Sequence, residues 1–79
     1  MKTHSLPNGN ISAKNIGHLI RKKRKQLQLT QKLAAGMCNT GIRFFSDLEN
    51  GKPTLEIDKV LQVLFAFGYQ INITDRSIT

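Results

Sequence analysis

Residues 29–52 (LTQKLAAGMCNTGIRFFSDLENGK) constrain the fold of this chain more than any other stretch of its sequence. Thr30 can cap a helix by accepting a backbone N–H from the first turn, and residues 31–37 then extend for about two turns with mostly small or apolar side chains. A break follows, in which Asn39 is one of the few residues other than glycine that tolerate a positive φ. Thr40 is the expected N-cap of the element that comes next.

A second short helix is expected over residues 41–50. Phe45 and Leu48 lie three residues apart and therefore share its inner face. Gly51 is typical of a helix end, and Pro53 prevents the helix from continuing. Two short helices around a turn of three to four residues match the helix-turn-helix of DNA-binding proteins, whose second helix enters the major groove.

A longer helix is expected before this pair, over residues 12–28, with Ser12 as its N-cap. Its apolar face and the positions beside that face comprise Ile16, Ile20 and Leu27, with Leu19 and Lys23. The last turns carry five consecutive basic residues, 21–25, whose positive charge suits the negative end of a helix dipole. These side chains could contact phosphates, or they could form a solvated face. Five consecutive side chains must point all round a helix, so they cannot all contact one DNA surface. Arg24 lies next to the apolar face and is expected to point inward, where it needs an acidic partner.

A further helix is expected over residues 55–67, capped by Thr54 and ended by Gly68. Its apolar stripe comprises Ile57, Val60, Leu61, Leu64 and Phe67. Val63 and Phe65 widen this stripe beyond what a single small core needs, so part of the helix is expected to have a second packing partner.

The hydrophobic period changes after Gly68, because apolar and polar side chains alternate in residues 69–75, as in a half-buried strand. A lone strand cannot satisfy its own backbone hydrogen bonds, so we expect it to pair with the same segment of a second chain. The pairing residues are Gln70, Ile71, Asn72, Ile73 and Thr74. The chain is thus divided into a flexible arm (1–11), a helical domain (12–68), a dimerisation strand and a tail (76–79).

Charge is distributed unevenly along the 79 residues, whose formal net charge is +7. Residues 1–46 contain nine bases and no acid, whereas residues 47–79 contain three bases and five acids, so one part of the surface suits a polyanion. The one cysteine, Cys38, excludes an internal disulfide, fits a reducing cytosol and is expected to fill space between helices. No apolar run approaches the ~20 residues of a membrane span, and no catalytic or metal-ligand cluster is evident. We therefore expect a cytoplasmic protein that is not an enzyme and needs no cofactor or metal.

The segments LTQK and DLENGKP resemble the Xre or lambda-repressor-like helix-turn-helix family. A longer match, IRKKRKQLQLTQK followed by RFFSDLENGKPTLEIDKVLQVLFAFGYQINI, resembles the HipB-type antitoxins within that family and covers roughly residues 15–73. The resemblance implies a mainly α fold. It would be a lambda-repressor-like DNA-binding domain of four to five helices, with a C-terminal β-strand that pairs across a homodimer.

The resemblance also implies roles for individual residues. The positions that face the bases are Gly41, Ile42, Arg43, Ser46 and Asp47. Arg43 is the best reader among them, because its guanidinium can engage guanine O6 and N7. The expected phosphate contacts are Gln31, Asn50 and Lys52, which the resemblance places there, together with Thr30, Lys32, Thr40 and Lys23. Arg24 and Glu49 stand where several phage repressors of this family carry a pair, so a largely buried ion pair is expected between them.

The leading expectation is a sequence-specific repressor that binds a palindromic DNA operator as a homodimer, associated with the bacterial nucleoid. In the narrower form that the resemblance implies, the chain is the antitoxin of a HipA-like kinase, represses its own operon and binds the kinase around Glu56 and Asp58. Two alternatives stay open: a stand-alone repressor of the phage or plasmid type, and a protein-interaction module for an acidic partner. Salt dependence distinguishes the last of these from DNA binding, because about 6–10 phosphate contacts give a log–log slope of roughly −5 to −9.

Overall fold

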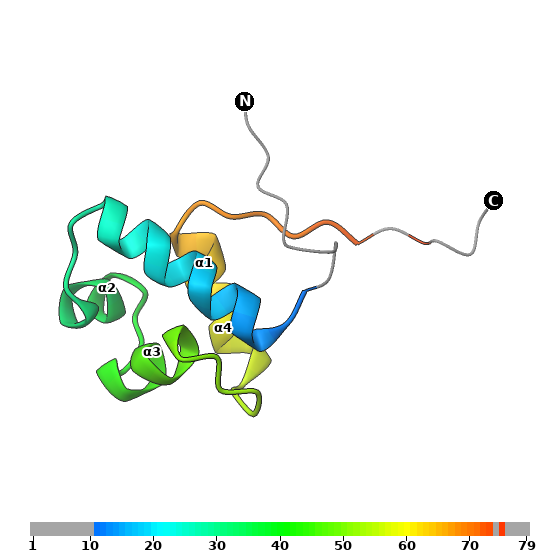
Figure 1. The fold of residues 1–79 in the computed structure, drawn as a ribbon, viewed down its shortest axis with the longest axis horizontal. Helices are drawn as coiled ribbons and strands as arrows, with labels where there is room; N and C mark the ends of the chain where they lie inside the picture. Colours follow the sequence, from blue (N-terminus) through cyan, green and yellow to red (C-terminus); the bar gives the residue numbers. More distant parts are fainter. Residues whose placement is uncertain (1–10, 74, 76–79) are drawn as a thin grey trace.

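The computed structural model of the chain describes residues 11–73 and 75, and this part contains four helices (Figure 1). The helices are α1 (Ala13–Gln26), α2 (Gln31–Met37), α3 (Ile42–Glu49) and α4 (Ile57–Ala66). α3 packs against both α1 and α2, and α2 and α3 form the helix-turn-helix. The mainly α fold is therefore confirmed for the residues that the structure describes.

One hydrophobic core receives side chains from all four helices. Its largest fully buried side chains are Phe45 and Leu48 from α3, Ile20 from α1 and Val63 from α4. The ring of Phe45 lies 6.1 Å from the ring of Phe67, centroid to centroid, at an interplanar angle of 36°. Because α3 contributes two of these four side chains, its inner face is anchored and the orientation of its outer face is fixed.

The helix starts and ends that depend on local chemistry form as expected. The Ser12 side chain accepts a hydrogen bond from the backbone N–H of Asn15 at 3.1 Å and caps α1. Asn39 adopts a positive φ of 58° in the break between α2 and α3. α1 ends at Gln26, two residues earlier than expected, because Gln28 also adopts a left-handed conformation, with φ 59°.

Two expected N-caps are wrong. The N-cap of α3 is Gly41, whereas Thr40 donates both its backbone N–H and its hydroxyl to the carbonyl of Ala35. Thr40 therefore closes α2 and cannot open α3. The N-cap of α4 is Glu56, not Thr54, since the chain forms a turn after α3 and first packs Leu55 against the core.

The apolar face of α4 is rotated from the expected stripe. Its inner side consists of Val60, Val63 and Leu64, followed by Phe67 at the C-cap. Val63, which was expected to be surplus, is fully buried, whereas Phe65 is 82% exposed. The outward face carries three apolar side chains at intervals of four residues: Ile57, Leu61 and Phe65. α4 thus leaves an apolar surface without a partner in the described part of the chain.

The segment after α4 follows an extended path without regular secondary structure in a single chain (orange in Figure 1). Gly68 adopts φ 85° and ends the helix, and the backbone N–H of Tyr69 donates to the carbonyl of Leu64 at 2.9 Å. Ile71 and Ile73 are 41% and 93% exposed. The strand expected over residues 69–75 is thus not formed by residues 69–73, and Thr74 lies outside the described residues, as do the arm up to residue 10 and the tail.

Candidate nucleic-acid interface

The turn between α2 and α3 is held by the core and by a side chain of α4. The Cys38 side chain is buried in the core, and burial raises the pKa of its thiol, which therefore stays protonated at neutral pH. The Gln62 side chain on α4 donates to the carbonyl of Cys38 at 2.6 Å. Cys38 thus has the expected space-filling role. Gln62 was missed by sequence reasoning, and its only signal was a polar residue between Leu61 and Val63.

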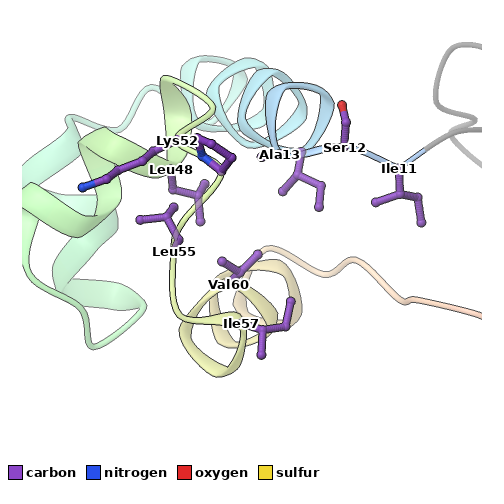
Figure 2. Close-up of a pocket in the computed structure, with 10 residues that line it drawn as sticks. Ile11, Ser12, Ala13, Leu48, Lys52, Leu55, Ile57 and Val60 are labelled. Atoms are coloured by element: carbon purple, nitrogen blue, oxygen red, sulfur yellow. The ribbon is translucent and has the colours of Figure 1, made fainter.

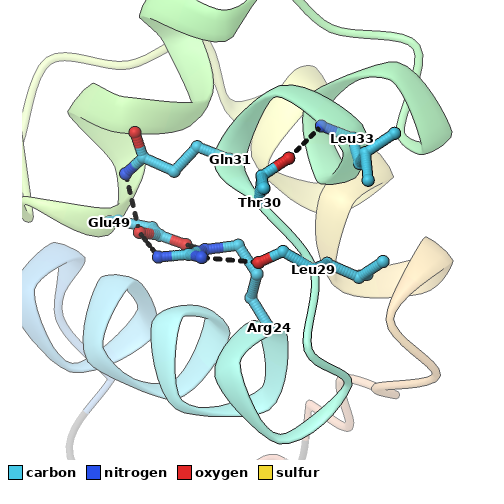
Figure 3. A network of polar contacts seen from close by, with 6 residues as sticks. All are labelled: Arg24, Leu29, Thr30, Gln31, Leu33 and Glu49. Carbon is cyan, nitrogen blue, oxygen red and sulfur yellow. Dashed lines mark hydrogen bonds and ion pairs between the residues drawn. The ribbon is translucent and has the colours of Figure 1, made fainter.

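A buried ion pair joins the end of α1 to the end of α3 (Figure 3). Arg24 Nε lies 2.6 Å from Glu49 Oε2, and Nη2 lies 3.1 Å from Oε1, so the contact is bidentate. The side chain of Glu49 is 1% exposed and that of Arg24 is 11% exposed. The third nitrogen, Nη1, donates to the carbonyl of Leu29 at 2.7 Å, which ties the α1–α2 connection to the same network.

Gln31 belongs to this network at the first residue of α2. Its Nε2 donates to Glu49 Oε1 at 2.9 Å, as Figure 3 shows. The preceding residue, Thr30, caps α2 by accepting the backbone N–H of Leu33 at 3.1 Å. The N-terminus of α2 is therefore held against the last residue of α3 through a single buried carboxylate. The two helices of the motif cannot change their relative angle without breaking that contact.

The expected base-facing positions lie along one side of α3. Gly41, Ile42 and Arg43 are exposed at its start, whereas Ser46 and Asp47 are half-buried one turn further on. The Arg43 side chain is 90% exposed, and its Nε lies 3.7 Å from Asp47 Oδ2. Lys52 Nζ, in the turn after the helix, lies 3.6 Å from the same oxygen. The structure thus brings two cations and one anion together on the outer side of α3.

The expected phosphate contacts occupy more varied positions. Thr30, Lys32 and Asn50 are exposed at helix ends, where their side chains are accessible. Thr40 is half-buried, and its hydroxyl donates to the carbonyl of Ala35 within the turn. Lys23 Nζ lies 5.2 Å from the centre of the Tyr69 ring, which is a cation–π contact with the segment after α4.

The five consecutive bases on α1 point in different directions. Arg21, Lys22 and Lys25 are exposed, Lys23 lies over Tyr69, and Arg24 points inward to Glu49. The expectation that such a run wraps round its helix is therefore confirmed, and Arg24 is the member that turns inward.

A close approach between α1 and α3 was missed by sequence reasoning. Gly17 is buried, and a Cβ placed on it would lie 2.2 Å from the backbone oxygen of Leu48 and 2.9 Å from that of Glu49. Gly51, with φ 78°, lies beside the backbone of Lys14 in the same region. The only sequence signal was a glycine inside a helical pattern, where it is intrinsically unfavourable.

An open apolar groove of about 200 Å³ lies between the start of α1, the turn after α3 and the start of α4 (Figure 2). Its lining is mostly aliphatic and comprises Ile11, Ala13, Ile16, Leu48, Pro53, Leu55, Ile57 and Val60, with Ser12 and Lys52. A small-molecule site combines such surface with several convergent polar groups, which this lining does not supply. The groove shares Ile57 with the exposed apolar side chains of α4 and reaches from there to Ile11.

Residues 11–73 and 75 contain no group of three or more His, Cys, Asp or Glu side chains that could hold a metal ion. Among the same residues, no helix combines the length and the apolar character that crossing a bilayer requires.

A known protein is similar to this chain over most of its length. The uncharacterised HTH-type transcriptional regulator y4mF of Sinorhizobium fredii (strain NBRC 101917 / NGR234) is 51% identical to it over 59 residues, which cover 75% of this chain and 78% of the relative. A continuous stretch of 59 residues in this chain of 79 must include residues 29–52, whichever residue it starts from. No family model matches the chain. The shared segment contains the whole motif formed by α2 and α3, and the chain belongs to the HTH-type transcriptional regulators.

Proposed function

We propose that the chain is a sequence-specific repressor that places the outer side of α3 in the major groove of an operator. The observation that carries this proposal is Arg43, whose side chain is 90% exposed on a helix with a rigidly anchored inner face. A guanidinium that projects from a fixed helix can reach a base edge in the groove, and its planar fork can pair with guanine O6 and N7 through two hydrogen bonds. The excess of positive charge supplies the accompanying attraction to phosphate.

Replacing Arg43 with alanine is expected to weaken binding to the operator by about 1–3 kcal/mol and to relax the preference at one base pair of each half-site. Titration of fluorescent duplexes, one carrying the site and one scrambled, measures both effects. Arg21→Ala is the matched control, because Arg21 is exposed on α1 and outside the motif. Equal losses on the two duplexes would show that Arg43 contacts only phosphate.

The repressor is further proposed to act as a homodimer joined by residues 70–74 of two chains. Three exposed apolar side chains support this arrangement: Phe65 at the end of α4, and Ile71 and Ile73 after it, which are 82%, 41% and 93% exposed. Burying them against a second copy is favourable, and pairing of the two segments would satisfy their backbone N–H and C=O groups. A two-fold axis would also place two copies of α3 about 34 Å apart, on successive turns of the major groove.

Deleting residues 70–79 is expected to abolish the dimer and to weaken operator binding strongly. The truncation keeps Tyr69, because this residue packs against the core and its backbone bonds to Leu64. Light scattering reports the mass, and circular dichroism of the same sample checks that the helices remain folded. A folded truncated chain that stays dimeric would mean that the helices alone form the interface.

The narrower proposal is an antitoxin that represses its own operon and binds a HipA-like kinase. It rests on the resemblance over residues 15–73 and on the start of α4, outside the α2–α3 motif, where exposed Ile57 lies between the exposed acids Glu56 and Asp58. A kinase that binds there could be held together with DNA. A stand-alone repressor of the phage or plasmid type is the alternative. A kinase-like reading frame beside this gene favours the antitoxin, and a complex of kinase, chain and operator in a mobility-shift assay tests the placement.

A further inference from the structure

Asp47 occupies an unusual electrostatic position for a surface proposed to meet DNA. Its Oδ2 lies 3.7 Å from Arg43 Nε and 3.6 Å from Lys52 Nζ, so one carboxylate is shared by two cations. The Asp47 side chain is 25% exposed, compared with 90% for Arg43 and 51% for Lys52. The anion is thus the most enclosed of the three groups, and the two cations project further from the surface than it does.

The backbone fixes this arrangement. The N–H of Lys52 donates to the carbonyl of Asp47 and the N–H of Gly51 donates to that of Leu48, both at 3.0 Å. With φ 78° at Gly51, these two bonds form a Schellman motif at the end of α3. The motif brings Lys52 back over Asp47, while helical spacing of four residues brings Arg43 to its other side. The helix and its C-terminal turn therefore place these three residues next to one another.

A carboxylate at this position opposes indiscriminate attraction to phosphate. The separations of 3.6 and 3.7 Å are well below the Debye length of about 8 Å at physiological salt, so Asp47 offsets part of the charge of Arg43 and Lys52. When Arg43 moves onto a base, Asp47 faces an anionic duplex with one cation fewer. The major groove offers it one favourable contact, an exocyclic amino group, and the amino group of cytosine N4 is the usual partner of a carboxylate.

We propose that Asp47 is a specificity-determining residue that penalises duplexes lacking an amino group, most favourably that of cytosine, opposite its carboxylate. The inference rests on the proposed function, because it assumes that α3 enters the major groove. It assigns to Asp47 a contribution to DNA affinity opposite in sign to that of the surrounding basic side chains. Arg43 and Lys52 add affinity, whereas Asp47 removes affinity from DNA of the wrong sequence.

The test compares three proteins: the wild-type chain, Asp47→Asn and the control Asp58→Asn. Both variants change the net charge by the same amount, but Asp58 lies on α4 outside the motif and makes none of the ion pairs among the described residues. Asparagine keeps the size of Asp47, and its amide can donate as well as accept. Each protein selects sites from a pool of duplexes with a randomised central segment. The selected duplex and a scrambled one are then titrated over a range of salt.

Asp47→Asn is expected to bind the scrambled duplex more tightly than the wild-type chain does and to lose selectivity at one cytosine-containing position. The ratio of selected-site to scrambled affinity should fall about five- to tenfold, which is the lower range for loss of one base contact. The salt slope on the scrambled duplex should steepen by about one, because one more cation is free to neutralise a phosphate.

Several outcomes would overturn the assignment. If Asp58→Asn changed the ratio as much as Asp47→Asn, net charge alone would account for the effect. Equal affinities of Asp47→Asn and the wild-type chain on both duplexes would remove any role for the carboxylate. If Asp47→Asn bound both duplexes more weakly than the wild-type chain does, Asp47 would only position Arg43 and would not select the sequence. A wild-type chain that selected no sequence would instead overturn the proposed function together with this inference.

Discussion

Glu49→Ala is expected to lower the free energy of unfolding by about 3–5 kcal/mol, which is a large part of the stability of a domain of this size. The substitution removes the acceptor of Arg24, whose side chain is 11% exposed and would be left as a buried charge without its partner. It also removes the acceptor of Gln31 at the start of α2. Loss of one partner of a buried pair costs more than the pair contributes, because the desolvation of the remaining charge is no longer offset.

Urea denaturation followed by circular dichroism measures this change. Glu56→Ala is the matched control, because Glu56 pairs with Lys59 at 3.8 Å in a contact where both side chains are more than half exposed. That exposed pair should contribute less than about 1 kcal/mol. A loss for Glu49→Ala as small as that of the control would mean that water replaces the carboxylate and that the network does not hold the motif together.

Gly17→Ala is the second substitution with a large expected effect, a loss of about 1–3 kcal/mol of folding stability. The added methyl group would lie 2.2 Å from the backbone oxygen of Leu48. A flexible side chain could move aside, but a backbone oxygen can do so only if α1 and α3 separate. Such a separation would also strain the Arg24–Glu49 contact, which spans the same two helices.

Gly36→Ala provides the opposite expectation within the same fold. Gly36 is a helical residue of α2, and a Cβ placed on it meets nothing within 4 Å. Alanine is favoured over glycine inside a helix by about 0.5–1 kcal/mol, so this variant should be more stable than the wild-type chain. Thermal unfolding of the two alanine variants is compared with that of the wild-type chain. If both Gly17→Ala and Gly36→Ala stabilised the chain, α1 and α3 would have to lie farther apart in solution than the 2.2 Å approach at Gly17 implies.

Sequence reasoning succeeded where a few neighbouring residues decide the structure. Ser12 and Thr30 cap their helices because a side-chain oxygen three residues before a free N–H is enough to bind it. Asn39 and Gly51 adopt positive φ because few other residues can. The existence and order of the four helices follow from such signals together with the hydrophobic period.

Sequence reasoning failed where a residue had two possible local partners. Thr40 could cap α3 or close α2, and both uses are compatible with its neighbours in the sequence. The choice depended on the free carbonyl of Ala35, which Thr40 satisfies with two hydrogen bonds. Thr54 and the start of α4 were misplaced for a related reason, since packing of Leu55 against the core delays the helix.

The candidate site shows the same division. The helix-turn-helix of residues 29–52 was predictable from local signals, because caps, turn residues and apolar spacing act over a few positions of the chain. It also suggested that Arg24 points inward, and a family resemblance supplied Glu49 as its partner. The burial of Val63 and the exposure of Phe65 could not be predicted in this way, because the rotation of α4 depends on the shape of the core left by the other helices. The position of Gly17 against the backbone of α3 likewise became visible only in the packed structure, since no local signal encodes the distance between two helices.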